Sequence, residues 1–207
     1  GLALHEGSHI LLSDFDFLKG LRGSTPKEYF HRAETKGYSE SESLGHIKNL
    51  LNYVEDRRID YFVFTNSPGY KGYYHSMYDK YFRAKVVDKG LLSDEYTDEN
   101  IDSYFFRIIN ITNSNTRLNK LNGLREIWKV LDLKNVSRLK NTEDAFNTAL
   151  DVYNVVLNNL PDGIEKTNKD TGEVSYERAD GSGDSPHSDE DTIGSGSSTE
   201  ESREITE

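Results

Sequence analysis

The residues of this chain whose types and spacing could do chemistry lie near its start, in His5-Glu6-Gly7-Ser8-His9. On a helix, residues four apart share a face, so His5 and His9 can present two imidazoles to one metal ion. Neutral imidazole suits a tetrahedral Zn2+ ion. Glu6 is rotated by about 100° from His5 and borders the metal. There it can act as general base toward a water whose pKa the zinc lowers to about 7, which predicts hydrolysis of peptide bonds.

A zinc site of this kind needs a third protein ligand, and residues 52–60 supply the candidates. Projected at 100° per residue from Leu44, the apolar side chains Ile47 and Leu51 fall at about 300° and 340°, and Glu55 falls at about 20°. A carboxylate within an apolar helix face is costly to bury unless it is paired or bound to metal. We therefore predict Glu55 as the third ligand.

The same segment leaves other roles open. Glu55 could instead form a buried salt bridge with Arg57 or Arg58. Asp56 and Asp60 are four residues apart and project toward the polar side of the helix, at about 120° and 160°. They could hold an arginine or support a metal-bound histidine from behind.

A tyrosine-rich segment follows, and two of its residues are candidates for stabilising a reaction intermediate. Tyr74 and His75 could donate a hydrogen bond to the oxyanion that forms during attack on a carbonyl. The alternative is ordinary packing, because tyrosines recur there at helical spacing, which favours an amphipathic helix.

The elements that position these residues are predicted to be helices. Apolar side chains recur at steps of three and four, and no convincing alternating pattern of a strand is present. Proline or a capping residue bounds several of these segments. We expect a mainly α fold with helices over residues 1–13, 26–33, 43–64, 70–87, 98–112, 122–135 and 142–160.

Charge divides the chain into two parts. The 207 residues carry 36 acidic and 25 basic side chains, a net charge of −11, and residues 162–207 hold 14 of the acids and 4 of the bases. That segment is rich in Gly, Ser, Thr, Asp and Glu and too poor in apolar residues to offset chain entropy. We therefore expect a folded domain over residues 1–161 and a disordered acidic linker over 162–207. Since the motif begins at residue 5, we also expect missing upstream elements, among them a small sheet.

Composition excludes several classes of protein. The chain has no cysteine, which rules out a disulfide scaffold, a thiolate metal site and a cysteine nucleophile. No apolar run is long enough for a transmembrane helix, and no signal peptide is recognisable, so we expect no membrane association and a cytoplasmic location. The nearly neutral body has no basic excess with which to bind nucleic acid.

Three segments also carry a resemblance to a known family. ALHEGSHILLSDF, NYVEDRRID and GYKGYYHSMYDKYF resemble the N-terminal zincin-like region of bacterial and phage proteins with a C-terminal von Willebrand A domain, relatives of the cobalt chelatase T subunit. The resemblance covers about residues 1–160. It implies a MoxR-type AAA+ ATPase as partner and accounts for an acidic linker. Two departures stand out. No von Willebrand domain is present, and Ile59 occupies the position, four after Glu55, where zincins with a glutamate ligand commonly carry Asp.

Two functions follow as hypotheses. The first is a zinc metallopeptidase of bacterial or phage-infected cells that acts on a peptide or protein substrate. In it His5, His9 and Glu55 hold zinc and Glu6 is the base. The second is a zincin-like assembly module without turnover, in which an attached von Willebrand domain and an ATPase do the work.

Overall fold

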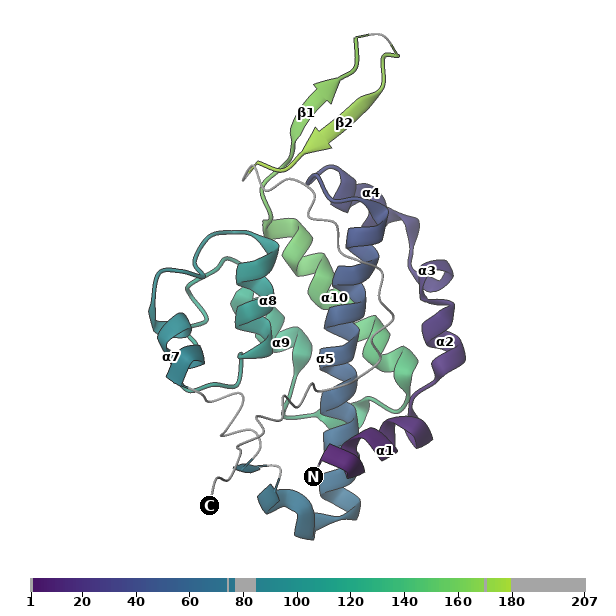
Figure 1. Ribbon diagram of the computed structural model, residues 1–207, viewed down its shortest axis with the longest axis vertical. Coiled ribbons are helices and arrows are strands. Elements are labelled where there is room, and N and C mark those ends of the chain that lie inside the picture. Colours follow the sequence, from purple (N-terminus) through teal and green to yellow (C-terminus); the bar gives the residue numbers. More distant parts are fainter. Residues whose placement is uncertain (1, 74, 77–84, 170, 180–207) are drawn as a thin grey trace, which may run out of the picture.

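The computed structural model describes residues 2–73, 75–76, 85–169 and 171–179, and in these ranges the chain is mainly α-helical, as predicted (Figure 1). In chain order, the elements are α1 (Leu2–Leu12), α2 (Phe15–Lys19), α3 (Leu21–Ser24), α4 (Lys27–Glu34), α5 (Glu40–Asn66), the 3-10 turn η1 (Pro68–Tyr70), α7 (Lys85–Leu92), α8 (Ile101–Ile109), α9 (Leu124–Leu131), the 3-10 turn η2 (Val136–Arg138), α10 (Thr142–Asn159), β1 (Ile164–Thr167) and β2 (Val174–Glu177).

The long helix α5 is the central element, and α10 packs beside it (Figure 1). A capping box starts α5: the Ser39 side chain accepts from the Glu42 backbone, and the Glu42 side chain accepts from the Ser39 backbone. The helix ends at Asn66, before Ser67 and Pro68. An asparagine cap, Asn141, starts α10. Both helices are therefore delimited by local sequence signals.

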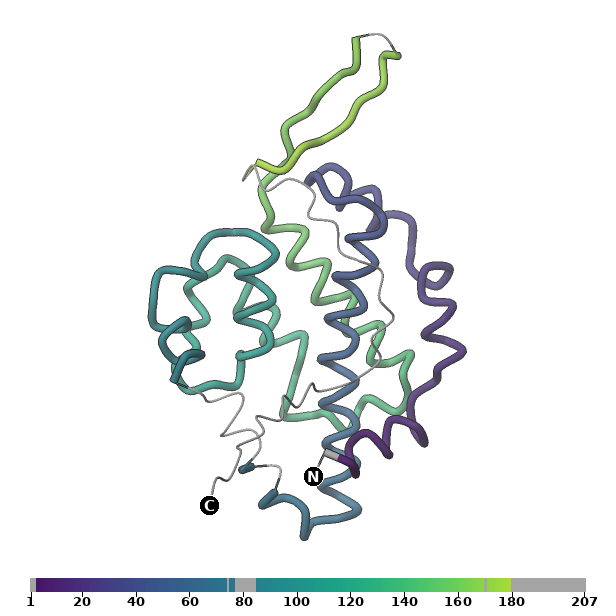
Figure 2. Tube along the Cα trace, in the orientation of Figure 1, coloured from purple at the N-terminus to yellow at the C-terminus, as the bar shows by residue number. Residues whose placement is uncertain are grey.

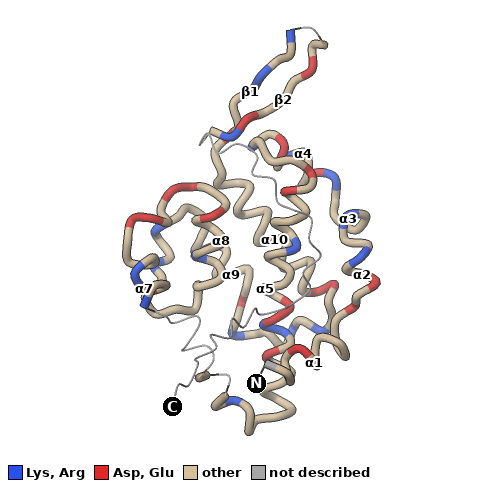
Figure 3. The backbone as a smooth tube through the Cα atoms, in the orientation of Figure 1, with Lys and Arg blue, Asp and Glu red and all other residues tan. Residues whose placement is uncertain are grey.

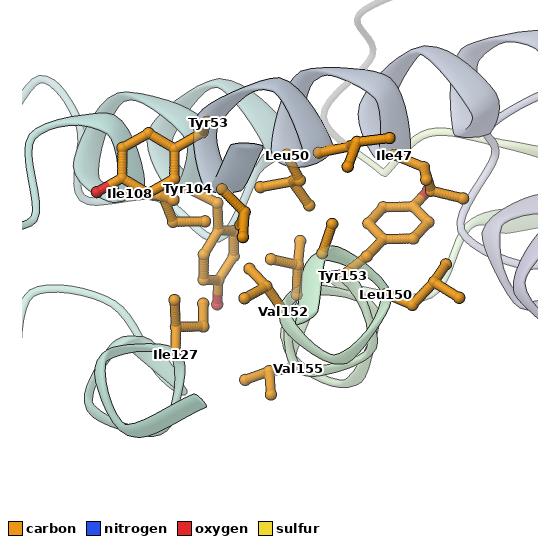
Figure 4. Packing of buried hydrophobic residues seen from close by; sticks show 14 of the residues in the cluster. Ile47, Leu50, Tyr53, Tyr104, Ile108, Ile127, Leu150, Val152, Tyr153 and Val155 are labelled. Atoms are coloured by element: carbon orange, nitrogen blue, oxygen red, sulfur yellow. The ribbon is translucent and has the colours of Figure 1, made fainter. Parts of the chain in front are cut away.

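The main core lies where α5 and α10 face α8 and α9 (Figure 4). These helices contribute aliphatic and aromatic side chains that are almost completely buried. At a few kcal/mol for each large apolar side chain removed from water, this contact dominates the stability of the body. The labelled members of the cluster are Ile47, Leu50, Tyr53, Tyr104, Ile108, Ile127, Leu150, Val152, Tyr153 and Val155.

Helix α1, which carries the histidine motif, crosses the C-terminal part of α5 (Figure 2). A second, smaller apolar cluster joins the two helices. In it Ile59 and Val63 of α5 are buried against Leu4 and Leu12 of α1, with Phe64 beside them. Contact between α1 and α5 therefore does not depend on the main core.

A two-stranded antiparallel hairpin follows the helical body and projects from it (Figure 1). Ile164 pairs with Glu177 and Thr167 with Val174. The sequence predicts disorder from residue 162, and that expectation is wrong for residues 164–167 and 174–177, which form strands. The reason is local. Thr167 and Val174 favour strands, and the turn between the strands contains Gly172, with φ of 71°. Residues 180–207 lie outside the described ranges.

Other boundaries differ modestly from the prediction. The cap of α8 is Asn100, whose side chain accepts from the Ser103 backbone, so the helix begins at Ile101, three residues after the predicted start. Of the helix predicted over residues 70–87, residues 74 and 77–84 are not described. Among the described helices, none has the length and apolar character needed to cross a membrane.

Candidate metal centre

Two histidines of α1 and one aspartate of α5 bring three metal-binding atoms together. Nε2 of His5 lies 3.1 Å from Nε2 of His9. Oδ1 of Asp56 lies 3.2 Å from the His9 atom and 3.6 Å from the His5 atom. Within the described ranges, this is the one trio of such side chains whose ligand atoms all lie within 4.8 Å of one another. The structure thus confirms that His5 and His9 share a face and point to one place.

The opposite ring nitrogen of each histidine is held by a hydrogen bond. Nδ1 of His5 lies 2.9 Å from Oδ1 of Asp60, so the ring donates its proton to that carboxylate. Nδ1 of His9 lies 3.0 Å from Oγ of Ser13, whose own proton goes to Glu55 at 2.8 Å. Ser13 must then accept from Nδ1 of His9. Both rings therefore carry Nδ1–H and direct Nε2 toward Asp56, the ring orientation that a metal ligand requires.

Glu55, the predicted third ligand, takes a different position in the structure. Its two oxygens accept from Arg58, Nε at 2.8 Å and Nη2 at 2.6 Å. Thr142 donates to it at 3.0 Å, in addition to Ser13. The side chains of Glu55 and Arg58 are both almost completely buried. The arrangement is the buried salt bridge that the sequence offers as the alternative, and the structure does not bring Glu55 to the histidine pair.

Asp56 occupies the third position because α5 has two buried faces. Ile47, Leu51 and Glu55 face the body, whereas Ile59 and Val63 face α1. Asp56 and Asp60 are four residues apart, as are Ile59 and Val63, and each aspartate lies three residues before one member of this second apolar pair, so the aspartates flank it. The projection of the sequence treats the stripe through Ile47 as the only buried face. The pair formed by Ile59 and Val63 is the signal that could have identified Asp56.

Asp60 lies where the sequence predicts a supporting carboxylate, behind a histidine. It is also the residue four positions after Asp56. If Asp56 is the third ligand, the chain thus carries an aspartate four residues after that ligand. If Glu55 is the ligand, Ile59 occupies that position. Asp60 is nearly buried, and its second oxygen lies 3.7 Å from Nη2 of Arg57. Acidic and basic residues of α5 lie next to one another in this part of the helix, where α1 crosses it (Figure 3).

Electrostatics favour a positive charge within the cluster. Burial lowers the pKa of His5, but the hydrogen bonds and charges of Asp56 and Asp60 outweigh it and raise the pKa to about 9. For Asp56, burial raises the pKa, and the bonds to His5 and His9 outweigh it and lower the pKa to about 2. Without metal, a proton therefore lies among the three groups near neutral pH. A divalent cation would replace that proton.

The donor set fits zinc by type and by spacing. Two imidazoles and a carboxylate are common zinc ligands. Ligand atoms about 2.0–2.1 Å from a tetrahedral ion lie roughly 3.3–3.4 Å apart. The three separations, 3.1, 3.2 and 3.6 Å, bracket that spacing. The side chain of Asp56 is 41% exposed, compared with 12% for His5, so solvent reaches the cluster beside Asp56.

The remaining predicted site residues are Glu6, His75 and Tyr74. Glu6 is exposed on α1 and makes no hydrogen bond or ion pair with any residue that the structure describes, so its carboxylate is accessible. His75 is exposed and lines a cavity that Asp60 also lines. Tyr74 lies outside the described residues. Sequence reasoning missed Ser13 and Thr142, which contact His9 and Glu55, because hydroxyl side chains at such distances in the chain leave no pattern.

Comparison of the chain with models of protein families, with curated protein sequences and with solved structures gave no match. The candidate metal centre is therefore supported by its geometry alone.

Proposed function

We propose that this protein is a zinc-dependent peptidase domain in which His5, His9 and Asp56 hold the ion. The observation that supports the proposal most strongly is the convergence of two imidazole Nε2 atoms and one carboxylate oxygen within 3.6 Å of one another. Without metal a proton shared among these atoms offsets their repulsion, and a bound cation would take its place. Asp60 and Ser13 hold the rings in this orientation, which a metal site requires and a simple surface pair does not.

Each remaining part of the chemistry belongs to a residue of the chain. A bound zinc ion would supply Lewis-acid polarisation of a peptide carbonyl and of water. The Glu6 carboxylate, exposed one residue after His5, accepts the proton of the attacking water and delivers it to the leaving amine. Asp56 lies on the solvent side, so substrate would approach beside it. Tyr74 and His75 are retained as candidate oxyanion donors.

Zinc titration of the metal-free protein tests the site. We expect one zinc ion per chain by calorimetry and elemental analysis. His9→Ala and Asp56→Asn should lose at least tenfold in affinity, since each removes a ligand. His31→Ala is the matched control, because His31 is an exposed histidine of α4 paired only loosely with Glu34. A protein that binds no stoichiometric zinc, or that loses it equally in the His31 variant, contradicts the proposal.

A peptide library assayed by mass spectrometry tests the activity. Glu6→Gln should keep zinc binding and lose cleavage by about 10²-fold or more, because the amide cannot take up the proton. Retention of full cleavage by this variant would remove Glu6 from the mechanism. Loss of both zinc binding and cleavage would show that Glu6 contributes to metal binding rather than to proton transfer.

One observation favours a second function, a structural zinc in an assembly module. All three ligands lie at the junction of α1 and α5, which a small apolar cluster and the hydrogen bonds of Arg58 to Leu12 and of Ser13 to Glu55 also join. A zinc ion there would fix α1 to α5 without turnover. In this version the module acts in the cytoplasm with a MoxR-type AAA+ ATPase. Recovery of such an ATPase by co-purification from bacterial lysate, with zinc bound and no peptide cleaved, favours the module. Cleavage by the domain alone counts against it.

A further inference from the structure

A cavity of about 330 Å3 lies on the side of α5 next to the metal centre. Arg57, Asp60, Tyr61 and Phe64 form its α5 wall. These residues follow one another at steps of three, one and three, so they form one stripe of the helix. The opposite wall comes from the end of α8 with the residues after it and from the connection between α9 and η2. Its volume is at the lower end of the roughly 300–1,000 Å3 of small-molecule pockets.

The walls of the cavity are mainly apolar. Tyr61 and Phe64 of α5 face Ile109, Leu133 and Val136 across it. Tyr61 is 45% exposed and Ile109 46% exposed, so the cavity opens to solvent between them. An apolar group that enters it would cover surface that water now contacts, which is favourable in proportion to the area removed from water.

Three polar side chains of the cavity are already engaged with other parts of the protein. Asp60 accepts from His5, and its other oxygen faces Arg57. The amide of Asn113 donates to Asp88, and that of Asn110 donates to the backbone oxygen of Phe106. A charged ligand would have to displace these bonds, whereas an apolar ligand leaves them in place. The cavity therefore selects for apolar surface.

Asp60 joins the cavity to the metal centre. One of its oxygens lies 2.9 Å from Nδ1 of His5, and its side chain lines the cavity. The cavity and the histidine pair therefore share this one side chain.

We infer that this cavity binds an aromatic or branched aliphatic side chain of the peptide substrate, next to the bond to be cleaved. The identity of the ligand as a peptide rests on the proposed function. Binding of the apolar group itself does not require zinc, because no lining residue needs to move to complete the cavity.

Small peptide analogues added to the metal-free, 15N-labelled protein test the inference. N-acetylphenylalaninamide at millimolar concentration should shift the backbone NMR signals of Tyr61, Phe64, Ile109 and Val136 in a saturable manner. N-acetylglycinamide, which lacks a side chain, and the amide of N-acetylaspartate should bind at least tenfold more weakly. Equal shifts with the glycine analogue, or no saturable shift with the phenylalanine analogue, would overturn the inference.

A filled cavity provides the matched variant. Ile109→Trp places a larger side chain at the half-exposed edge of the cavity and should abolish the saturable shifts. Leu92→Trp is the control, since Leu92 is 53% exposed on α7 and does not line the cavity. Persistent binding in Ile109→Trp, with native-like spectra, would place the analogue elsewhere and reject the cavity. If the protein takes up zinc but fails this test, the inference about the cavity is rejected and the proposed function remains. If it passes the test but takes up no zinc, the proposed function is rejected and binding to the cavity remains.

Discussion

At the scale of single residues, His5 lies between two carboxylates, Asp56 and Asp60, and holds its proton more tightly than an ordinary histidine does. Its pKa of about 9 in the folded, metal-free protein exceeds the ordinary value of 6.5. The folded state therefore binds this proton more tightly than the unfolded state. We expect the His5 proton to make its full contribution to the free energy of unfolding below pH 6.5. That free energy should fall by ~2–3 kcal/mol as pH rises to about 9. Urea denaturation in the presence of a chelator measures it.

His5→Gln serves as the control for this pH dependence. The amide has no proton to lose in that range, so the decline between pH 6.5 and 9 should disappear. At acidic pH the group that changes stability is Asp56, whose pKa is lowered to about 2. Its contribution is present above its ordinary value of 3.8 and is lost as pH falls toward 2. A stability that stayed constant up to pH 9 in the native protein would contradict the role of Asp56 and Asp60 around His5.

Glu55 and Arg58 form a buried pair whose two members depend on each other. Arg58→Met leaves a buried carboxylate with only Ser13 and Thr142 as donors, so we expect a loss of about 3–5 kcal/mol in the free energy of unfolding. Glu55→Gln/Arg58→Met should cost less than the sum of the two single variants, which a double-mutant cycle measures. The cycle is sensitive to direct contact and not to remote effects.

The same variants separate a supporting role of Glu55 from that of a ligand. Gln at position 55 retains an oxygen that accepts from Ser13, so Glu55→Gln should still bind one zinc ion per chain. Asp56→Asn should not. A folded Glu55→Gln protein that binds no zinc, beside an Asp56→Asn protein that does, would restore Glu55 as the ligand and reject Asp56.

At the scale of elements, α1 contains a glycine in its interior that packing does not require. A Cβ added to Gly7 meets no atom within 4 Å, so Gly7→Ala should raise the free energy of unfolding by about 0.5–1 kcal/mol through helix propensity alone. The contrasting case is Gly123, the N-cap of α9, with φ of 71°. There a Cβ would lie 2.4 Å from Nδ2 of Asn159 and 2.8 Å from Cγ1 of Val155, so Gly123→Ala should destabilise. Thermal denaturation of both variants checks the opposite signs.

The helices show how far sequence could take the fold and the site. Periodicity and caps were sufficient for α1, α5 and α10, because each carries a strong apolar stripe between clear boundaries. Periodicity could not decide between Glu55 and Asp56, because that choice depends on which side of α5 receives α1. The sequence contains both stripes of α5, but only the packing assigns one to the body and the other to α1. The contacts of Ser13 and Thr142 with Glu55 span 42 and 87 residues and have no local signature.

At the scale of the whole molecule, charge and structure divide the chain at slightly different places. The helical body through residue 161 carries 22 acidic and 21 basic residues, and the strongly acidic part begins at 162. The hairpin after it nevertheless contacts the body at its base. The Gly163 amide donates to the Thr35 carbonyl at 2.9 Å, and Lys36 pairs with Asp162 at 2.7 Å. Arg178 pairs with Glu42 and lies over the Tyr38 ring.

These contacts are few and mostly at the surface, so the hairpin should contribute little to the body. Its side chains are largely exposed, and a two-stranded hairpin alone is marginally stable in water. Removal of residues 162–207 should therefore lower the free energy of unfolding by only ~1–2 kcal/mol and leave zinc affinity unchanged. Arg178→Ala, which removes one contact at the base, should account for part of that loss. A truncated chain that fails to fold, or that folds and no longer binds zinc, would make the hairpin an integral part of the domain and move its boundary to residue 179.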